Sequence, residues 1–589
     1  MLNKLKNFFI YSDVKKNKEI FEDFQSSSEF IIPDPICSYE SDLEFGKDVL
    51  NDIEFESVFK AINKCHLTGG ASVLKFICKT PIHNLDILNK RKDILISFED
   101  NFDSSILTDL SKLENDILWL FHDQGEHIET LYNMIYFKFY FMKHLNNNGT
   151  VLTAYNLYRI IISPLVGILS PIIYFIVPYF VLRFSFHIKI SFIAFLKLMF
   201  KSMTMSQDIL FSSGNNKYIR MISCMFSLLF YFQGLFNSFE ISNTMNKICS
   251  HIVNKINNII DFIKKADTLI KSLWSDDINK AFFLNDLFKS SDQERKYIDS
   301  LNIIKYGLFG QNFGNQLKEF KFINKDIIKS ILYKTYILDA LIGVLKFKHQ
   351  HDFSYPDFIL SDKPSMDVIS IRHPSLSKPI DNDVSIGGKK RNNAILTAGN
   401  SAGKSVLLKN LLINIILSQT ITISCSSKCS FTPFYHINSQ INVPDSTGFE
   451  SLFVAEMHRC KHNLDMLKSL KPMQFSFIVM DEIFNSTNPY EGIASAYSVC
   501  KKIASYENNM LIFTTHFNYL TKLAKDTKLF TNYKMDVIVD KSDIQFTYKI
   551  KKGINKHHLA LELLKRDGFD SDILEEALKL KNMFLCSNV

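Results

Sequence analysis

The residue types best suited to chemistry lie in two short segments of the carboxyl-terminal half. Gly403, Lys404 and Ser405 follow one apolar run, and the acidic pair Asp481 and Glu482 ends another. A glycine-rich turn in front of a helix presents backbone N–H groups to phosphate. A lysine in such a turn reaches the β- and γ-phosphates, and the serine hydroxyl binds Mg²⁺. Asp481 is predicted to join the magnesium shell and Glu482 to polarise the attacking water. The pattern therefore predicts a nucleoside triphosphate site.

The elements that must position the lysine are a strand, a loop and a helix. Residues 393–397 (NAILT) read as a short apolar strand, AGNSAGKS as the loop, and residues 406–417 as an apolar helix. This context is the one a phosphate loop requires. The usual first glycine is replaced by Ala398, with Gly399 displaced by one place, and alanine is tolerated there only where φ is negative. The residues expected to contact the nucleotide from this loop are Ala398, Gly399, Asn400, Ser401, Ala402, Gly403, Lys404, Ser405 and Val406.

Two further apolar runs should place polar groups at the same sheet edge. Residues 475–480 show no alternation, which is typical of a buried parallel strand that delivers Asp481 and Glu482 at its carboxyl end. Residues 509–520 contain another such strand, followed by Thr514, Thr515 and His516. His516 is predicted to sense the γ-phosphate through a hydrogen bond. The alternative is a strand-end histidine that faces solvent.

The length, net charge and cysteine content of the chain limit its number of domains, its possible partners and its redox environment. The chain has 589 residues, enough for several domains, and a formal net charge of +7. That charge permits contact with nucleic acid or anionic lipid without requiring it. Ten cysteines are scattered, and only Cys425 and Cys429 lie close together, which is a weak pattern for zinc. We therefore expect reduced thiols in an intracellular protein.

An apolar segment interrupts the helical first half of the chain. Residues 160–182 carry no charge over 23 positions, and a second uncharged run covers residues 221–238. The first run is long enough to cross a bilayer. Between the two runs basic residues outnumber acidic ones, with Asp208 the one acid. Pro164, Pro171 and Pro178 interrupt the first run, which favours a re-entrant or interfacial segment, although two spans remain open. The alternative is a buried helix pair in a soluble protein.

Taken in order, segments between residues 365 and 589 resemble the MutS family of ATPases, relatives of the ABC-type ATPases. In the signature-like segment Ser451 and Glu456 match, and after the acidic pair Thr487 and Glu491 match. The segments that carry the resemblance are IRHPSL (371–376), DNDVSI (381–386), TAGNSAGKS (397–405), GFESLFVAEMHR (448–459), MDEIFNSTNPYEG (480–492), TTH (514–516) and FTYKIKKG (546–553).

The resemblance implies ATP and Mg²⁺ as cofactors, with Lys404, Glu482 and His516 as the catalytic residues. It also implies a homodimer, or a MutS-like heterodimer, whose composite ATP sites receive Ser451 from the opposite subunit. Three departures are Pro379 near the usual place of an adenine-stacking aromatic, Asn485 in place of a basic residue, and Gly448, which is one place out of register.

The amino-terminal match is thinner. Residues 67–95 are similar to the start of the family's helical core and lever, and too few residues precede them to hold a mismatch-reading domain. The expected fold is therefore multidomain α and α/β. A helical core and lever region is interrupted by an apolar membrane-like insertion and followed by an ABC-type P-loop ATPase domain. The predicted division is an extension (1–60), helical core (61–158), apolar hairpin or re-entrant segment (159–240), helical lever (241–360) and ATPase domain (361–589).

Two functions follow from these expectations. The first is an ATP-dependent, DNA-binding, mismatch-repair-related ATPase that acts on duplex DNA. The second is a membrane-attached mechanical ATPase that acts on a membrane or protein partner. The apolar insertion and the DEIFNSTNP segment also resemble a divergent, membrane-linked or large-DNA-virus type of MutS-like protein. An intracellular location is expected, with the ATPase domain in the cytoplasm and the apolar segment at a membrane.

Overall fold

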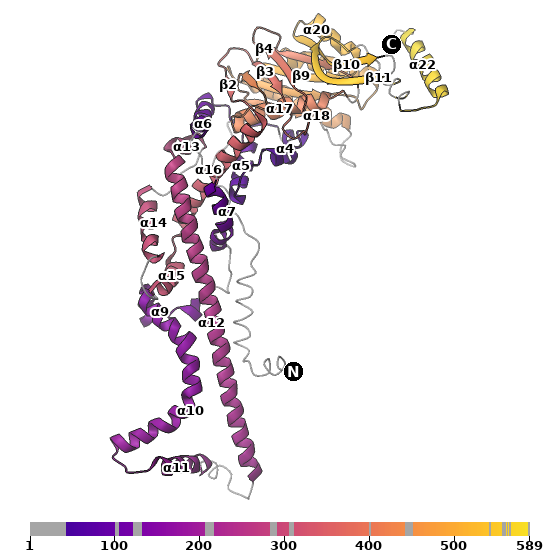
Figure 1. The fold of residues 1–589 in the computed structure, drawn as a ribbon. Coiled ribbons are helices and arrows are strands. Elements are labelled where there is room, and N and C mark those ends of the chain that lie inside the picture. The colour runs from indigo at the N-terminus through magenta and orange to yellow at the C-terminus, as the bar shows by residue number, and fades with distance from the viewer. Residues whose placement is uncertain are drawn as a thin grey trace. The chain divides into compact units, whose positions relative to one another are not determined.

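The computed structural model describes residues 43–46, 48–99, 105–121, 132–205, 217–282, 291–305, 311–399, 402–441, 452–540, 543–555, 561, 564 and 567–586. The chain forms two compact units. The first combines residues 1–33, 112–267 and 289–331, and the second combines residues 34–111, 268–288 and 332–589. Figure 1 shows the elements of both units, and each unit is described by itself below.

A seven-stranded sheet forms the centre of the second unit, in the order β1-β7-β8-β9-β5-β10-β11. Neighbouring strands are parallel except for the antiparallel pair β10 and β11. The strands are β1 (Glu44–Phe45), β5 (Asn393–Thr397), β7 (His436–Gln440), β8 (Ser476–Asp481), β9 (Asn509–Thr515), β10 (Phe530–Asp540) and β11 (Asp543–Lys552). Strands β5, β7 and β9 are buried along their whole length. Strand β8 is buried up to Met480, as its run without alternation predicted.

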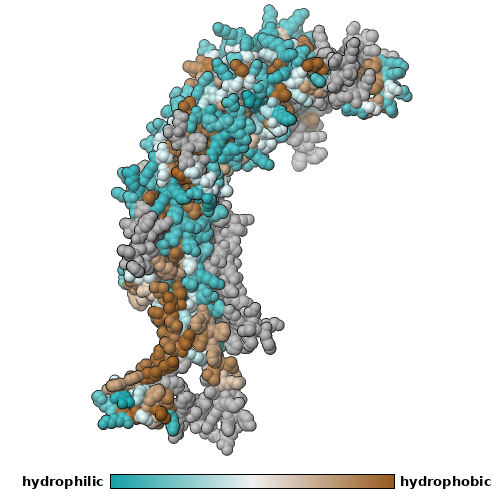
Figure 2. Space-filling model, viewed as in Figure 1, coloured by the Kyte–Doolittle hydropathy of each residue, from teal (hydrophilic) through white to brown (hydrophobic). Residues whose placement is uncertain are grey.

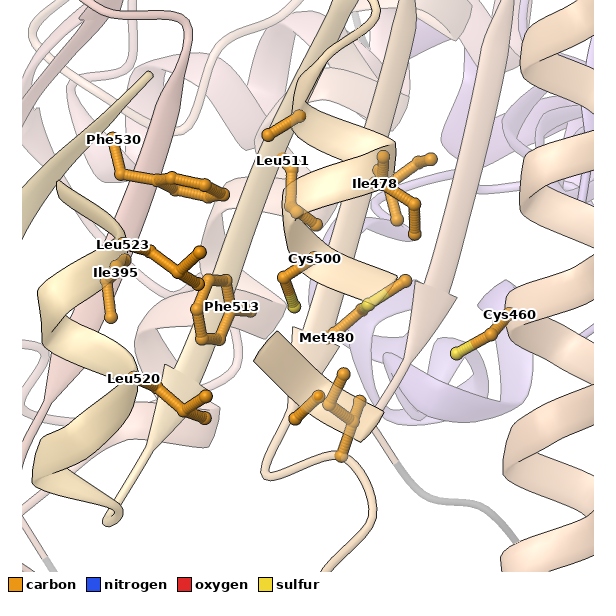
Figure 3. Close-up of a cluster of buried hydrophobic side chains, with 14 of the residues drawn as sticks. Ile395, Cys460, Ile478, Met480, Cys500, Leu511, Phe513, Leu520, Leu523 and Phe530 are labelled. Atoms are coloured by element: carbon orange, nitrogen blue, oxygen red, sulfur yellow. The ribbon is translucent and has the colours of Figure 1, made fainter. Parts of the chain in front are cut away.

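Helices cover the sheet and enclose an apolar core. They are α17 (Lys404–Thr420), α18 (Leu452–Ser469), α19 (Pro489–Ala504), η5 (Asn518–Lys522) and α20 (Leu523–Asp526). Figure 3 shows part of this core, in which Phe513 of β9 and Met480 of β8 lie near Cys500 of α19. The aromatic rings of Phe513 and Phe530 meet edge to face, with centroids 5.7 Å apart. This packing fixes the strands whose carboxyl ends carry the polar residues.

The second unit also contains a smaller, four-stranded sheet. Its order is β2-β6-β3-β4, formed by β2 (Pro356–Phe358), β3 (Ser365–Ile371), β4 (Asn382–Gly387) and β6 (Lys428–Phe431). Strand β3 alternates between buried and exposed positions, because one face packs on the core and the other meets solvent. Gly387 has φ +81°, and a Cβ there would come within 2.0 Å of the Pro364 carbonyl oxygen. The turn after β4 therefore requires glycine.

Residues from the amino-terminal part of the chain also belong to this unit. Strand β1 pairs in parallel with β7 at the sheet edge, and it is followed by α3 (Val49–Asp52), α4 (Phe55–Ile62), α5 (Thr68–Lys79) and α6 (Leu85–Phe98). The Arg91 guanidinium of α6 donates to the carbonyl oxygens of Ala281 in α13 (Asp276–Ala281) and Thr420 in α17. The predicted division at residue 60 remains a prediction, whereas the contacts place residues 44–98 against the carboxyl-terminal half of the chain.

The amino-terminus of α5 is fixed by a buried carboxylate. Asp339, which is fully buried in α16 (Lys325–His351), accepts the backbone N–H groups of His66 and Leu67 at 3.0 and 2.9 Å. Such a contact satisfies N–H groups that a helix start leaves without partners. Because α5 packs against α17, this contact connects α16 to the helix that begins with Lys404.

The first unit is helical. Its elements are the end of α7 (Ser105–Leu118), η1 (Trp119–Phe121), η2 (Tyr140–Asn147), α9 (Gly149–Leu157), α10 (Ser163–Phe180), α11 (Phe192–Met205), α12 (Lys217–Leu273), α14 (Ser291–Lys305), α15 (Gln311–Phe322) and the start of α16. Two π-helical turns, η3 (Tyr158–Ile162) and η4 (Val181–Ser185), flank α10. Trp119 stacks on Phe320 of α15 with ring centroids 5.6 Å apart. Gly149 and Gly314 bring α9 and α15 into close contact, since a Cβ on Gly314 would meet the Gly149 carbonyl oxygen.

The apolar segment forms two antiparallel helices. Ile160 contacts Ser242, and further along α10 Gly167 contacts Tyr231 of α12, so residue numbers rise on one helix as they fall on the other. Figure 1 shows α10 beside α12. Pro164 and Pro171 lie inside α10 without ending it. Helix α12 is continuous across residue 240, so the predicted boundary at that position coincides with no helix break.

Candidate nucleotide site

The predicted polar residues meet at the carboxyl ends of three neighbouring strands. Strand β5 lies between β9 and β10, and β9 lies between β5 and β8. The register pairs Thr397 of β5 with Thr515 of β9, and Thr514 of β9 with Asp481 of β8. The loop after β5, the acidic pair after β8 and His516 after β9 therefore leave the sheet at the same level. This edge is where ligands bind in open parallel sheets.

The loop has the backbone conformation of a phosphate cradle at the residue before the helix. Gly403 has φ +87°, and a Cβ there would lie 3.0 Å from the Tyr548 ring. Ala398 is buried and does not have a positive φ, so alanine is compatible with that position. Ala402 is also buried, and Val406 is exposed on the first turn of α17. The structure also describes Gly399, whereas Asn400 and Ser401 lie outside the described residues.

The two predicted magnesium ligands contact each other. The Ser405 hydroxyl donates to Asp481 Oδ2 at 2.5 Å, and the Thr514 hydroxyl donates to Asp481 Oδ1. The backbone N–H of Glu482 in turn donates to the Thr514 hydroxyl at 3.1 Å. A carboxylate and a hydroxyl are hard oxygen donors of the kind that Mg²⁺ takes in phosphate sites. The residues present therefore fit Mg²⁺, with Ser405 and Asp481 as protein ligands and the phosphates and water as the remaining ones.

Lys404 and Glu482 form an ion pair across the same edge. Lys404 Nζ is buried and contacts Glu482 Oε1, and it lies 3.4 Å from the Ala398 carbonyl oxygen. On the other side, Glu482 Oε2 accepts from Asn485 Nδ2 at 2.9 Å and lies 3.5 Å from His516 Nδ1. The bond from His516 and the ammonium of Lys404 lower the pKa of Glu482 to about 2, although burial opposes the shift. Glu482 is therefore ionised throughout the physiological range.

The backbone around Glu482 is unusual. Glu482 has φ +48° and Phe484 φ +59°, both in the left-handed region that non-glycine residues rarely adopt. Glu456, buried on α18, accepts the N–H of Phe484 at 3.1 Å and the Ser486 hydroxyl at 3.4 Å. Positive-φ residues of this kind persist only where neighbouring contacts hold them. The matched residue Glu456 thus connects α18 to the acidic loop, whereas Ser451 lies outside the described residues.

A pocket lies directly beside the phosphate loop. Its volume is about 280 Å³, and it is lined by residues from the loop before β4, from α17 and from the β10–β11 hairpin, among them Pro379, Ile380, Asn382, Gly403, Met535 and Tyr548. The Asn382 amide donates to the Tyr548 carbonyl oxygen at 3.0 Å and accepts the Ile550 N–H at 2.8 Å, which fixes the strand that carries Tyr548. The size and the mostly apolar lining suit a nucleoside base next to its phosphates.

Sequence reasoning did not find Tyr548 as a binding residue. It noted that Pro379 stands where an aromatic is usual, and the structure places both Pro379 and Tyr548 on the same pocket wall. Tyr548 is separated from Lys404 by more than a hundred residues, and its segment resembled a dimer contact. No pattern in the sequence around Tyr548 indicates that its ring lies next to Gly403.

The cysteines are packing residues in the described parts of the chain. Cys425 and Cys429 are buried and free, and no cluster of three His, Cys, Asp or Glu side chains suited to a metal occurs among the described residues. Burial raises the pKa of Cys78, Cys249 and Cys460 to about 12. Such thiols are unreactive at neutral pH, in keeping with the reduced state expected from the sequence.

Comparisons with known proteins find similarity in the same region of the chain. Residues 394–584 match the family model for MutS domain V. The DNA mismatch repair protein MutS of Persephonella marina is 23% identical over 312 residues, which cover 52% of this chain and 34% of that protein. The MutS of Finegoldia magna is 26% identical over 278 residues (45% of this chain, 32% of that protein), and the MutS of Prochlorococcus marinus is 27% identical over 266 residues (43% and 28%).

The match spans about a third of the length of these curated relatives, and the matched domain includes the strand, loop and acidic pair described above. Through this carboxyl-terminal region, the chain is similar to proteins of the MutS family.

Proposed function

We propose that the protein hydrolyses ATP with Mg²⁺ at the edge formed by β5, β8 and β9. The observation that carries the proposal is the convergence of Lys404, Ser405 and Asp481 with Glu482 on one partly buried network. No packing need accounts for a buried lysine, two carboxylates and a serine at a sheet edge. A triphosphate with its metal supplies the charges that this set complements.

Each residue has a role that follows from its position. Lys404, released from Glu482, neutralises the transferred phosphate. Ser405 and Asp481 hold Mg²⁺, which when bound neutralises the developing charge on the phosphate oxygens. Glu482 stays ionised and orients the attacking water, while His516, within 3.5 Å of Glu482, senses the γ-phosphate. Catalysis of this kind depends mainly on positioning and charge neutralisation.

The proposed active form is a dimer with composite sites, either of two identical chains or of this chain with a MutS-like partner. Ser451 would approach the ATP of the opposite subunit, as the family resemblance implies. Glu456, on α18, holds the acidic loop, so docking of a partner on α18 can change the position of Glu482. ATP turnover should therefore rise with protein concentration in the range where dimers form.

The proposed substrate of the ATP-driven motion is duplex DNA. The relatives are named as DNA mismatch repair proteins, and the net charge of +7 permits phosphate contact. Binding to plain duplex DNA over a salt series tests this role, because phosphate contacts weaken steeply as salt rises.

A second candidate function is favoured by the apolar segment. A membrane-attached ATPase would act on a membrane or protein partner, in an intracellular setting with the ATPase domain in the cytoplasm. The MutS-like type linked to membranes or to large DNA viruses belongs to this proposal. The described residues include one helical stretch long and apolar enough to span a bilayer, Gly149–Ser170, of mean hydropathy 1.4.

The test of ATP hydrolysis compares Glu482→Gln and Lys404→Ala with wild type. Glu482→Gln should bind ATP and release phosphate at least about 100-fold more slowly, because one oriented group is lost. Lys404→Ala should lose ATP binding. Glu507→Gln and Lys468→Ala, which change exposed ion pairs outside the site, serve as matched controls. Unchanged turnover in both site variants would refute the proposal.

A further inference from the structure

The most prominent surface that the nucleotide site leaves unexplained is the outer face of α10 and α12. Nearly every exposed position of α10 carries an apolar side chain, including Leu165, Val166, Ile172 and Val177, each 43–52% exposed. The outer face of α12 continues this surface with Phe226, Phe230, Phe232 and Phe236, each 46–63% exposed. Figure 2 shows these apolar residues gathered along α10 and the adjoining part of α12. We call this pair of helix segments, residues 158–185 and 221–241, the apolar arm.

Burial on α12 changes abruptly where the apolar arm begins. From Met245 onward the helix buries a regular apolar stripe inside the first unit, including Ile248, Ile252, Ile256 and Ile259. Among the described side chains of residues 225–241, Met225, Phe226, Leu228, Leu229, Phe230, Phe232, Phe236, Phe239 and Ile241 are at least 38% exposed instead. The apolar side chains of α12 are therefore buried within the unit in one part of the helix and exposed in the other. Surfaces of that extent mark an interaction site on a soluble protein.

The lengths of the two helix segments match a bilayer. Residues 160–182 and 221–239 contain no charged side chain over 23 and 19 positions. At about 1.5 Å per residue these runs extend over roughly 35 and 28 Å, against a hydrocarbon core of about 30 Å. Arg159 and Arg183 bound the first run, and each lies over a tyrosine ring one turn earlier, Tyr155 or Tyr179. Arginine and tyrosine at the ends of an apolar helix are typical anchors at the membrane interface.

The carbonyl oxygens that the prolines of α10 leave without a backbone donor are bonded by side chains of α12 and α10. Pro164 and Pro171 lack the N–H groups that would bond the carbonyl oxygens of Ile160 and Gly167. The Ser242 hydroxyl of α12 donates to the Ile160 carbonyl oxygen. At a solvent-exposed surface, water could donate hydrogen bonds to those carbonyl oxygens. In the hydrocarbon core of a bilayer, the donor must come from the protein.

The second proline is compensated in the same way. The Tyr231 hydroxyl lies 3.3 and 3.2 Å from the carbonyl oxygens of Gly167 and Ile168, and the Ser170 hydroxyl donates to Gly167 at 2.8 Å. Gly167 also allows close approach, since a Cβ there would lie 3.3 Å from Leu235. Small residues and interhelical hydroxyl bonds are the means by which helices associate in lipid.

The tip that joins the two helices is basic. It contains Arg183, Lys189, Lys197, Lys201, Lys217 and Arg220 against the single acid Asp208. In the described part of the tip, α11 packs its Phe195 ring on Tyr179, with centroids 5.5 Å apart, and leaves Lys197 exposed. A helix with apolar and basic residues of this kind suits an anionic headgroup layer.

We propose that the apolar arm inserts into a lipid bilayer as an antiparallel helical hairpin, with Ile172 and Phe230 near mid-depth and α11 at the headgroups. The partner is the lipid itself. A second copy of the chain is disfavoured because the exposed apolar positions spread over about half of the α10 circumference, wider than one helix–helix seam requires.

Tryptophan fluorescence tests the insertion, because the chain has only two tryptophans and both lie outside the apolar arm, at positions 119 and 274. Ile172→Trp and Phe230→Trp place reporters at mid-depth, and Leu360→Trp, at a position 79% exposed in the other unit, is the matched control. The full chain is reconstituted into vesicles that carry bromine either near the middle of the acyl chains or near the headgroups. Wild-type emission is subtracted.

The two arm reporters should be quenched several-fold more by bromine at mid-chain than near the headgroups, and Leu360→Trp by neither. Flotation should be stronger with anionic than with neutral vesicles. Arm reporters that are quenched no more than Leu360→Trp would overturn the proposal. So would blue-shifted but unquenched emission from the arm reporters, which indicates that protein rather than lipid covers the arm. ATP turnover of the same variants reports separately on the nucleotide site.

Discussion

The Lys404 ammonium is paired with the Glu482 carboxylate, so the lysine proposed to bind phosphate and the acid proposed to orient water contact each other directly. An incoming triphosphate must take the lysine away from the acid. The carboxylate is then left with Asn485 and His516 as its partners. Under the proposed function, binding of the phosphates and release of the Glu482 carboxylate are therefore one event.

The ion pair predicts a pH dependence of stability. The folded pKa of Glu482 is about 2, below its ordinary value of 4.5, so its stabilising contribution is complete above about pH 4.5 and is lost as the pH falls through the folded value. The contribution is roughly 3 kcal/mol at most, reduced by partial exposure. The difference in the free energy of unfolding between wild type and Glu482→Gln should be constant near neutral pH and shrink toward about pH 3. Glu507→Gln should show no such trend, and a pH-independent difference would contradict the assignment.

Gly403 and Gly568 have nearly the same φ angle but different surroundings. Replacing each by alanine therefore separates the cost of backbone strain from the cost of steric crowding. Gly403 has φ +87° with the Tyr548 ring 3.0 Å from a would-be Cβ, whereas Gly568 has φ +84° and open space. Gly568→Ala should cost only backbone strain, about 1 kcal/mol. Gly403→Ala should cost more and reduce ATP affinity at least about 10-fold, because the phosphate cradle and the Tyr548 ring must both move. Denaturant unfolding and calorimetric titration measure the two effects, and equal losses would show that Tyr548 is not a constraint.

The pocket beside Gly403 predicts a role for Tyr548 in binding the nucleoside. Tyr548→Ala should raise the Kd for ATP about 10-fold, since base–aromatic stacking contributes about 1–3 kcal/mol per base. Tyr548→Phe keeps the ring and should bind like wild type. Tyr140→Ala removes a tyrosine that is 90% exposed and is the control. If inorganic triphosphate loses as much affinity as ATP, the ring acts on the loop rather than on the base.

Glu456 should couple α18 to catalysis. Glu456→Ala leaves the buried N–H of Phe484 without its acceptor, at a cost of about 1–3 kcal/mol, and frees the positive-φ loop that carries Glu482. ATP turnover should fall at least about 10-fold while the Kd for ATP changes little. Glu456→Gln retains an acceptor and should recover much of the rate. Asp465→Ala, on an exposed face of the same helix, should leave both quantities unchanged.

The proline compensation in the apolar arm can be tested by a double-mutant cycle. Ser242→Ala removes the donor to the Ile160 carbonyl oxygen, and Pro164→Ala restores a backbone N–H that can reach the same oxygen. The loss of stability from Ser242→Ala should be smaller by about 0.5–1 kcal/mol when Pro164 is already alanine. Thermal unfolding in detergent micelles measures the cycle. Strict additivity would mean that the Ser242 hydroxyl has no part in closing the helix.

Patterns within single segments of the sequence predicted the site residues that end a strand or begin a helix. Lys404 and Ser405 follow a strand and begin a helix, and Asp481 and Glu482 end a buried strand, so each position could be inferred from its own segment. That β5, β9 and β8 are neighbours explains why these local patterns meet. The family assignment from the same segments is confirmed by the domain match.

Contacts between residues far apart in the sequence could not be inferred from local patterns. The contact between Asp52 and Ser439 joins residues 387 positions apart, and the Tyr548 ring reaches Gly403 from a distant hairpin. No local pattern specifies either partner, since β1 is only two residues long and Tyr548 lies in an ordinary alternating strand. The unbroken course of α12 past residue 240 was also hidden, because the pattern there changes from apolar to amphipathic without a helix-ending residue.

Strand β1 has a practical consequence for how the catalytic half can be isolated. It occupies the β7 edge, and Asp52 behind it accepts the Ser439 hydroxyl at 2.7 Å and the Ile441 N–H at 3.1 Å, while Asp48 pairs with Arg459 of α18. A fragment that starts at residue 361 would bare those strand groups and leave Arg459 without its carboxylates. Uncovered edges of this kind recruit strands from other molecules. Soluble catalytic fragments should therefore need residues 43–62 supplied in the same polypeptide or as a separate peptide.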